Sequence, residues 1–189
     1  MSLLAENQTL SRQTYTETGF PKGEYMACTF EHCDFSKTNL STVDFVDCRF
    51  LHCNFSLADV KNTAFKSCTF EHSKVTGVNF GGCNPFMFSV TFLHCILNYS
   101  VFFKQRMKKT VFTSCTLKQT DFEETDLTEA VFDNCDLTGA NFYKTILEKA
   151  DLRTATYFDI DPEQNKLKKA RFSLASLPGL LGKYDLKIE

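Results

Sequence analysis

Large apolar residues recur at every fifth position along most of the chain. One series runs by fives from Leu10 to Phe80, and a second runs from Phe92 to Leu152. From Cys28 onward, the position two residues before each large one holds a small residue, with Gln105 as the exception. A period of five fits neither the 3.6-residue period of an α-helix nor the two-residue period of a strand. The pattern therefore predicts a solenoid built from short units.

Residues of one kind also recur every twenty positions. Cys28, Cys48 and Cys68 form one such series, and Phe and Leu alternate along the large positions from Phe112 to Leu147. Four five-residue sides per coil would place Phe ladders on two opposite sides of the rod and Leu ladders on the other two. That arrangement balances the core volume in each layer.

The five-residue series slips by two within residues 81–91. Gly81, Gly82 and Pro85 supply the special backbone angles of a bulge or short loop. We expect this loop to separate two stacks of coils. It is either a tolerated insertion or a protruding contact loop.

The individual units resemble the pentapeptide-repeat pattern Ala-[Asp/Asn]-Leu-x-x. The residues that carry the resemblance are Ala130-Val131-Phe132, Cys135-Asp136-Leu137, Ala140-Asn141-Phe142 and Ala150-Asp151-Leu152. The resemblance implies an all-β fold, a right-handed quadrilateral β-helix in which each pentapeptide is one side of a square coil. We predict an N-terminal cap over residues 1–17, the β-helix over 18–157 with the slip at 81–91, and an irregular last coil with a C-terminal cap over 158–189.

The C-terminal segment predicts a short helix and strand. Ser176 is a candidate N-cap, with Pro178 in the first turn and Gly182 at the end, and residues 185–189 alternate like a strand. The apolar residues of this cap are Leu177, Leu180, Leu181, Tyr184, Leu186 and Ile188. They either seal only their own coil or also face a second chain. Because members of the family commonly dimerise through such caps, the resemblance implies a homodimer.

Composition narrows the location of the protein. The N-terminus lacks a basic region followed by an apolar one, so we expect no secretory signal and a cytoplasmic protein. The uncharged stretch from Val75 to Phe103 contains Gly, Pro, His and several amide and hydroxyl residues, which argues against a membrane span. An odd number of cysteines, nine, indicates free thiols in a reducing compartment.

Candidate catalytic and metal-binding patterns are sparse. No Cys-x-x-Cys pair occurs, and the thiols occupy inward positions, so we expect neither a metal site nor a cofactor. His32, His52, His72 and His94 each precede an inward small position and should form an outward ladder, with a weak metal or pH-sensitive contact as the alternative. We find no nucleophile with a base and no phosphate-binding loop, and so expect no catalytic residue and no enzyme.

Charge is unevenly distributed although the net charge is only −2. The segment from Asp121 to Asp161 contains eleven acidic and three basic residues, and basic residues flank it on both sides. The predicted partner-binding strip consists of Asp121, Glu123, Glu124, Asp126, Glu129, Asp133, Asp136, Glu148 and Asp151.

Two structural causes account for part of this acidity. The Asp residues at the second position of the motif can serve the turn. Three pairs stand twenty residues apart and would stack opposite charges on neighbouring coils, namely Glu124 with Lys144, Glu129 with Lys149, and Asp133 with Arg153. A self-compensated surface and a docking strip therefore both remain open.

Pentapeptide-repeat proteins of this size include Qnr-like quinolone-resistance proteins and microcin- and albicidin-immunity proteins. These act on DNA gyrase and topoisomerase IV, and their rods resemble duplex DNA in width and charge. The chain is similar to that group in its length, its break near Gly81, the basic segment after it and its compact C-terminal cap, but it is less acidic and has no long inserted loop.

The resemblance implies a non-enzymatic, protein-binding solenoid that does not itself bind nucleic acid. In its specific form, the protein is a DNA mimic that modulates or protects a type II topoisomerase. The alternative is a structural interaction scaffold for an unrelated cytosolic partner, since the paired charges reduce the likeness to DNA.

Overall fold

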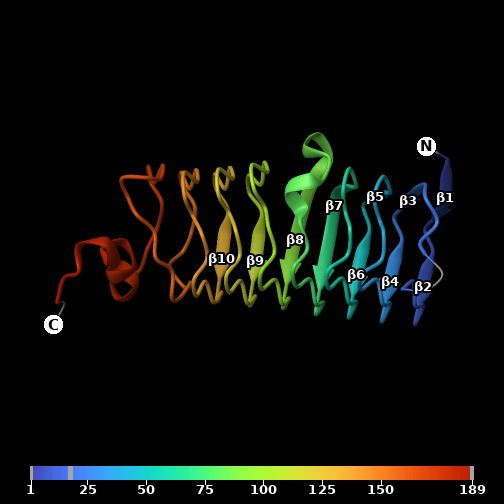
Figure 1. Ribbon diagram of the computed structural model, residues 1–189, viewed down its shortest axis with the longest axis horizontal. Coiled ribbons are helices and arrows are strands. Elements are labelled where there is room, and N and C mark those ends of the chain that lie inside the picture. Colours follow the sequence, from blue (N-terminus) through green and yellow to red (C-terminus); the bar gives the residue numbers. More distant parts are fainter. Residues whose placement is uncertain (1, 17–18, 188–189) are drawn as a thin grey trace.

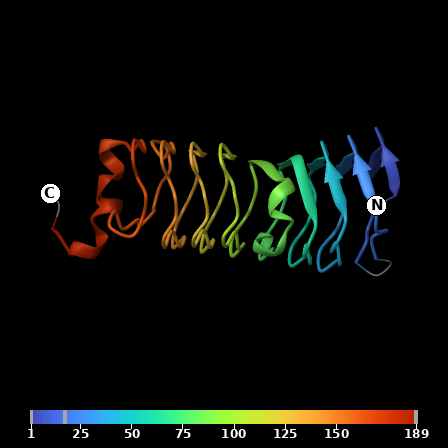
Figure 2. The ribbon, with the colours of Figure 1, turned by 90° about the horizontal axis from the view of Figure 1, so that it is seen from above.

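The structure, a computed structural model, describes residues 2–16 and 19–187. The chain winds into a rod of stacked coils, with the first strands at one end and the C-terminal helices at the other (Figure 1). The view from above shows the same straight stack (Figure 2). The fold is the right-handed quadrilateral β-helix that the resemblance to pentapeptide-repeat proteins implies.

The strands are short and, within the described residues, pair only in parallel. They are β1 (Leu3–Glu6), β2 (Thr9–Ser11), β3 (Glu24–Met26), β4 (Thr29–Glu31), β5 (Asp44–Val46), β6 (Arg49–Leu51), β7 (Ala64–Glu71), β8 (Phe88–Leu93), β9 (Val111–Thr113) and β10 (Val131–Asp133). Partners lie twenty residues apart, as Phe30 of β4 and Phe50 of β6 do. Single bridges such as Asp126 to Ile146 continue this register beyond the strands.

The β-ladder already begins within the first seventeen residues. β1 pairs with β3, and β2 pairs with β4 through Leu10 and Phe30. The segment predicted as an N-terminal cap therefore contains strands of the first coil.

Two ladders of Phe rings fill the second half of the core. The rings of Phe92, Phe112 and Phe132 stack with centroids 5.5 and 4.9 Å apart. On the opposite side Phe102 and Phe122 stack at 5.3 Å. The two ladders meet edge to face, one of the favoured arrangements of aromatic rings, with Phe112 and Phe122 at 6.1 Å and 81°. This confirms the arrangement predicted from the alternation of Phe and Leu.

The small inward residues bind carbonyl groups of the preceding coil. The Thr125 hydroxyl donates to the carbonyl of Phe102 at 2.7 Å, and the Cys68 thiol lies 3.4 Å from the carbonyl of Phe45. A buried hydroxyl needs a hydrogen-bond partner. The small inward position therefore accepts Thr, Ser and Cys because each can reach a carbonyl.

Each side of a coil ends in a tight corner. The corner residues have positive φ, for example 53° at His52 and 55° at Lys144. The Asp or Asn of the motif supports the turn, since Asp126 Oδ1 accepts a hydrogen bond from the backbone N–H of Thr128 at 3.1 Å.

The register changes at the predicted slip. Phe70 pairs with Phe92, twenty-two residues on, before the twenty-residue spacing returns between Phe92 and Phe112. Two 3-10 helices take up the extra residues, η1 (Phe80–Gly82) and η2 (Pro85–Met87). The side chains of Asn79 and Asn84 cap them. The helices protrude from the rod beside β8, in green in Figure 1.

Besides Phe172, which keeps the five-residue spacing, four Phe residues lie outside the two series. Phe88 and Phe158 are nevertheless buried, whereas Phe86 and Phe103 are exposed. Phe88 pairs with Phe65 and so fills the core position that the insertion displaces.

The C-terminal cap consists of η3 (Leu174–Leu180) and η4 (Gly182–Tyr184). The prediction of its boundaries was wrong. Ser173 caps η3, because its Oγ accepts a hydrogen bond from the backbone N–H of Ser176. Gly182 begins η4 instead of ending a helix.

The terminal strand is also not formed over residues 185–187, and residues 188–189 lie outside the described part of the chain. Asp185 has a φ of 49°, which turns the backbone out of the extended conformation. In the part of the chain that the structure describes, no helix is long and apolar enough to cross a bilayer.

Candidate functional site

The predicted acidic strip forms a belt around the rod. We name the four sides of the rod after their inward residues Phe132, Leu137, Phe142 and Leu147. Because one coil takes twenty residues, the segment from residue 121 to residue 161 circles the rod twice. Asp133 and Asp151 lie on the Phe132 side, Asp136 on the Leu137 side, Asp121 and Glu123 on the Phe142 side, and Asp126 and Glu148 on the Leu147 side, with Glu124 and Glu129 at corners. The structure therefore does not bring these nine residues together on one face.

Five of the nine carboxylates form ion pairs, mostly with the coil before or after their own. The pairs are Glu124–Lys104 at 3.5 Å, Asp126–Lys108 at 3.3 Å, Glu129–Lys109 at 3.9 Å and Glu129–Lys149 at 3.2 Å, Asp136–Lys118 at 3.1 Å, and Asp151 with Arg153 at 2.8 Å and Arg171 at 3.0 Å. Each exposed pair contributes only about 0–1 kcal/mol to stability. Together they cancel much of the negative field of the belt.

One of the three pairs predicted from the twenty-residue spacing forms. Glu129 binds Lys149 as expected. Glu124 pairs with Lys104 of the preceding coil instead of Lys144. The ammonium group of Lys144 lies over a neighbouring tyrosine ring, 4.9 Å from its centroid, which is a favourable alternative to the ion pair.

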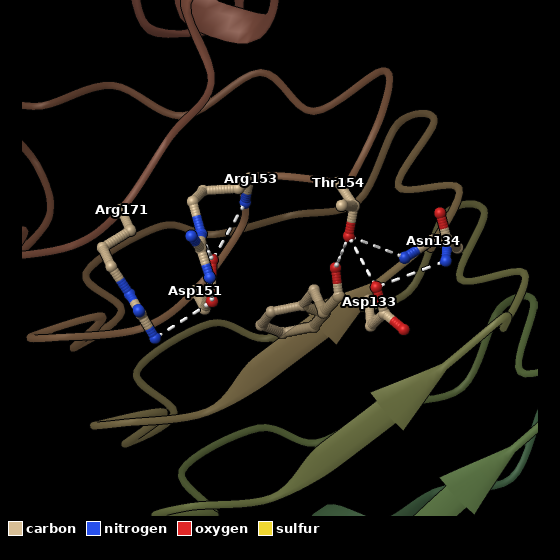
Figure 3. A network of polar contacts seen from close by, with 7 residues as sticks. Asp133, Asn134, Asp151, Arg153, Thr154 and Arg171 are labelled. Carbon is tan, nitrogen blue, oxygen red and sulfur yellow. Dashed lines mark hydrogen bonds and ion pairs between the residues drawn. The ribbon is translucent and has the colours of Figure 1, made fainter.

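Asp151 lies between two arginine side chains (Figure 3). Arg153 donates from Nε at 2.9 Å and from Nη2 at 2.8 Å to the two carboxylate oxygens. The predicted pair of Asp133 with Arg153 was therefore wrong, because two parallel hydrogen bonds to Asp151 are stronger than a single distant contact. The hydrogen bonds from Arg153 hold the pKa of the Asp151 carboxyl below its usual range, so Asp151 is ionised at neutral pH.

Asp133 binds neutral groups instead. Its Oδ1 accepts hydrogen bonds from Thr154 Oγ1 at 2.9 Å and Asn134 Nδ2 at 3.2 Å (Figure 3). Thr154 Oγ1 in turn accepts the backbone N–H of Asn134 at 2.9 Å. Asp133 and Thr154 line an open hollow together with Asp151 and Arg153. Most polar atoms at this hollow already form hydrogen bonds with one another.

The remaining four carboxylates of the belt have no cation within 4.0 Å among the described residues. They are Asp121, Glu123, Asp133 and Glu148. Asp121 and Glu123 lie together on the Phe142 side, beside Asn141 and Tyr143 of the next coil. Asn141 Nδ2 donates to Asp121 Oδ1 at 2.9 Å, and the Tyr143 side chain is exposed. We call Asp121, Glu123, Asn141 and Tyr143 the acidic stripe.

The four histidines form the outward ladder that their spacing predicts. The rings of His32 and His52 stack with centroids 4.8 Å apart, His52 and His72 at 5.1 Å, and His72 and His94 at 4.7 Å. Within residues 2–16 and 19–187, no group of three His, Cys, Asp or Glu side chains is arranged to hold a metal ion.

All nine cysteines are buried and unpaired. Burial raises the pKa of Cys48 to about 12. It likewise raises the pKa of Cys68 and Cys83 above the usual range of a thiol. These three thiols are therefore protonated at neutral pH and serve packing rather than chemistry.

The predicted cap residues have two kinds of environment. Leu177, Tyr184 and Leu186 are exposed, whereas Leu180 and Leu181 are half-buried, and Leu180 packs against the core. Ile188 lies outside the described residues. The most exposed apolar residue of the cap, Leu174 at 87%, was not predicted from the sequence. No periodic signal marks it, because the five-residue series ends before it.

The break contains a cleft that the sequence analysis also missed. It opens on the Leu147 side and is lined by Phe88, Ser89, Arg106, Lys108, Thr110 and Asp126. The exposed Phe86 stands beside it in η2. The only available signal was a phenylalanine outside the five-residue series.

Solved structures of other proteins share this fold. HetL from the cyanobacterium Nostoc sp. strain PCC 7120, a pentapeptide repeat protein involved in the regulation of heterocyst differentiation, is 15% identical, with a TM-score of 0.71 and coverage of 91% of this chain and 88% of HetL. QnrB1, a plasmid-mediated fluoroquinolone resistance protein, is 19% identical over 98% of this chain and 99% of its own, with a TM-score of 0.46. The likeness to HetL shows the fold alone.

No match was found among curated proteins. A family model described as a pentapeptide repeat region matches residues 24–85 and 86–172. The two matches meet inside the break, within η2. Together they cover most of the chain, and so the chain belongs to the pentapeptide-repeat family.

Proposed function

We propose that this protein binds a cationic protein partner through the acidic stripe. The observation that carries the proposal is the pair of uncompensated carboxylates, Asp121 and Glu123, next to the exposed ring of Tyr143 on one side of the rod. Exposed Tyr rings are common anchors of protein interfaces. Unpaired carboxylates beside such a ring favour a partner with Lys or Arg side chains.

The specific candidate is a type II topoisomerase, DNA gyrase or topoisomerase IV. Such an enzyme handles DNA on a cationic surface, and the carboxylates of the stripe would occupy it in place of phosphates. Only four carboxylates of the belt lack a cation among the described residues. The mimicry of DNA would therefore be local to the stripe and would not extend along the whole rod. The protein would act by binding, without catalysis, in the cytoplasm.

The test compares two double variants with equal changes in charge. Asp121→Asn with Glu123→Gln removes the charges of the stripe, whereas Asp133→Asn with Glu148→Gln removes two unpaired charges from other sides. We expect wild type and the second variant to bind purified gyrase and to change its supercoiling activity, with and without a fluoroquinolone. The stripe variant should bind at least about tenfold more weakly, since each lost charged contact contributes about 1.5 kcal/mol. Absence of binding by the wild-type protein would contradict the topoisomerase assignment.

The second candidate is a scaffold for an unrelated cytosolic partner. The five compensated carboxylates favour it, because paired charges give the rod little net attraction for DNA-handling surfaces. A pull-down from native cytosol with the wild-type chain and both double variants distinguishes the candidates. A partner other than a topoisomerase, captured by the wild type and lost only with the stripe variant, would support the scaffold.

We also propose that the cap forms a homodimer. Leu174, Leu177 and Leu186 are exposed at the end of the rod, where a second copy would cover them. Sedimentation velocity measures the outcome. The double variant Leu174→Ser with Leu186→Ser should shift a dimer to a monomer, and a wild-type protein that is monomeric at all concentrations would contradict the proposal.

A further inference from the structure

The hydrogen-bond ladder is interrupted on one side of the break. On the other three sides the bridges continue across it, as between Phe70 and Phe92 or between Lys74 and Ile96. On the Leu147 side, Phe88 pairs with Phe65 of the preceding coil. Among the described residues, no bridge joins Phe88 to the following coil at residues 106–108.

The interruption leaves a backbone donor without an acceptor. At equivalent positions the N–H of Asp126 donates to the carbonyl of Gln105, and the N–H of Val101 donates to that of Val78. The N–H of Arg106 has no such acceptor within the described chain. It faces the cleft between the two coils, where Ser89 provides a further polar group.

The side chain of Arg106 is a second unpaired donor in the same place. Its neighbours Lys104, Lys108 and Lys109 each pair with a carboxylate of the next coil. Asp126, which stacks directly on Arg106, is bound by Lys108. Arg106 therefore has no ion pair with any described residue. A free guanidinium and a free backbone N–H together match the two oxygens of a carboxylate.

Two exposed phenylalanines stand close in sequence to residues that line this cationic cleft. Phe86 is 87% exposed in η2, two residues before Phe88, which lines the cleft. Phe103 is partly exposed on the neighbouring side, with Lys104 4.6 Å from its ring centroid. The exposed ring of Phe86 is available for an apolar contact with a partner.

The surrounding charges select the kind of ligand. The coil after Arg106 carries Asp121, Glu123 and Glu124, so a polyanion such as DNA or RNA would meet repulsion one coil away. A single carboxylate next to an apolar side chain avoids that repulsion. We propose that the cleft is a docking site for a short acidic and apolar segment of a partner protein, with an Asp or Glu carboxylate on Arg106 and an apolar side chain on Phe86.

This site is independent of the acidic stripe, which lies on another side and has the opposite charge. A partner that binds through one site need not bind through the other. A peptide that binds only in the cleft therefore tests this site alone. A negative result would leave the proposed role of the acidic stripe unaffected.

The probe is the peptide acetyl-Leu-Glu-Leu-amide, titrated into ¹⁵N-labelled protein. The neutral peptide acetyl-Leu-Gln-Leu-amide and a short single-stranded DNA are the comparisons. We expect saturable shifts of the backbone amides of Ser89 and Arg106 with the Glu peptide, and binding about tenfold weaker with the Gln peptide, the value of one charge-assisted hydrogen bond.

Variants of the protein test which residues bind the peptide. Arg106→Gln should weaken binding of the Glu peptide about tenfold and abolish its preference over the Gln peptide. Lys166→Gln removes the same charge and is the control. Lys166 lies on the same side of the rod, two coils beyond Asp126, so its substitution should leave binding unchanged. Phe86→Ala should weaken both peptides equally, because it removes only the apolar contact.

Three results would overturn the proposal. They are equal binding of the two peptides, unchanged binding by Arg106→Gln, or tighter binding of the DNA than of the Glu peptide at the same amides. The dispersion of amide signals outside the break shows whether each variant is folded. If Arg106→Gln unfolds, Arg106→Lys should retain the charge preference at reduced affinity, and loss of that preference in a folded Arg106→Lys would also contradict the site.

Discussion

The side-chain amide of Gln105 donates a hydrogen bond of 2.7 Å to the backbone carbonyl of Phe80, across the break between the two stacks. Gln105 is the one large polar residue at the small inward position, and it is almost completely buried. Its Oε1 has no partner among the described residues. The carbonyl of Phe80 is also bound by the N–H of Cys83, so it would not be left unsatisfied without Gln105.

We therefore predict opposite effects for two substitutions of Gln105. Gln105→Met keeps the volume and loses two hydrogen bonds, the one to Phe80 and a weaker one of 3.4 Å to the Cys83 carbonyl, together about 1–2 kcal/mol. It also relieves a buried oxygen whose cost is about 1–3 kcal/mol. The variant should be as stable as the wild type or slightly more stable. Gln105→Ala leaves a cavity and should be about 2 kcal/mol less stable.

Urea unfolding measures both changes, with the exposed Gln164→Ala as a control expected within about 0.5 kcal/mol of the wild type. A loss of more than about 1 kcal/mol in Gln105→Met would show that Oε1 is satisfied, for example by a buried water.

The five-residue spacing predicted a solenoid, since it fixes which residues face inward, and the resemblance to pentapeptide-repeat proteins implied its four-sided coil. Burial of a large residue every five positions determines the coil, its twenty-residue register and the opposite Phe ladders. Phe88 could not be placed in this way. It fills a core position because η2 takes up the residues that the five-residue spacing would have placed there.

The candidate site was less predictable, because neighbours in sequence lie on different sides of the rod. Spacing places Glu129 next to Lys149 correctly, but long side chains also reach other partners. Arg153 binds Asp151, two residues away, rather than Asp133. The choice depends on rotamers and on hydrogen-bond geometry, and the repeat pattern contains no information on either.

A Cβ atom at Gly179 should displace the C-terminal cap. It would lie 2.4 Å from the carbonyl oxygen of Phe158 and 2.7 Å from its ring, and the backbone atom cannot move aside. The N–H of Ile160 also donates to the carbonyl of Gly179 at 2.8 Å, which ties η3 to the last coil. Gly179→Ala should therefore destabilise the cap by about 1–3 kcal/mol.

Amide hydrogen exchange distinguishes a local from a global effect. We expect faster exchange at Ile160 in Gly179→Ala and little change in the middle of the rod. Gly82→Ala is the matched control, since its nearest neighbour would be 3.8 Å from the new Cβ. Unchanged exchange in Gly179→Ala would mean that the cap is not held at this contact.

The ionised carboxylate of Asp151 should add to the stability of the folded protein at pH values above the pKa of an ordinary Asp. Hydrogen bonds from Arg153 lower the pKa of Asp151 in the folded protein, while an unfolded Asp has a pKa of about 3.9. A lowered folded pKa gives stability that is fully present above the unfolded pKa and is lost as the pH falls through the folded value.

Asp151→Asn keeps an oxygen for the backbone N–H of Arg153 and removes the charge. The variant should be less stable than the wild type at pH 7, and the difference should shrink as the pH falls below about 4. Thermal unfolding at several pH values measures this, with Glu148→Gln as the control for a carboxylate without an ion pair. A difference that is constant from pH 7 to pH 3 would contradict the assignment.

The nine cysteines should be inert in the folded protein. Their side chains lie in the core, where a reagent cannot reach them, and burial raises the pKa of Cys48, Cys68 and Cys83 above the usual range of a thiol. Iodoacetamide should leave all nine unmodified by mass spectrometry in the native protein and modify all nine in denaturant. Ser11→Cys adds an exposed thiol in β2 and should react within the same time in native buffer. Rapid native modification of any of the nine would show that the coils open locally near that cysteine, because an inward thiol can react only when its coil separates from its neighbours.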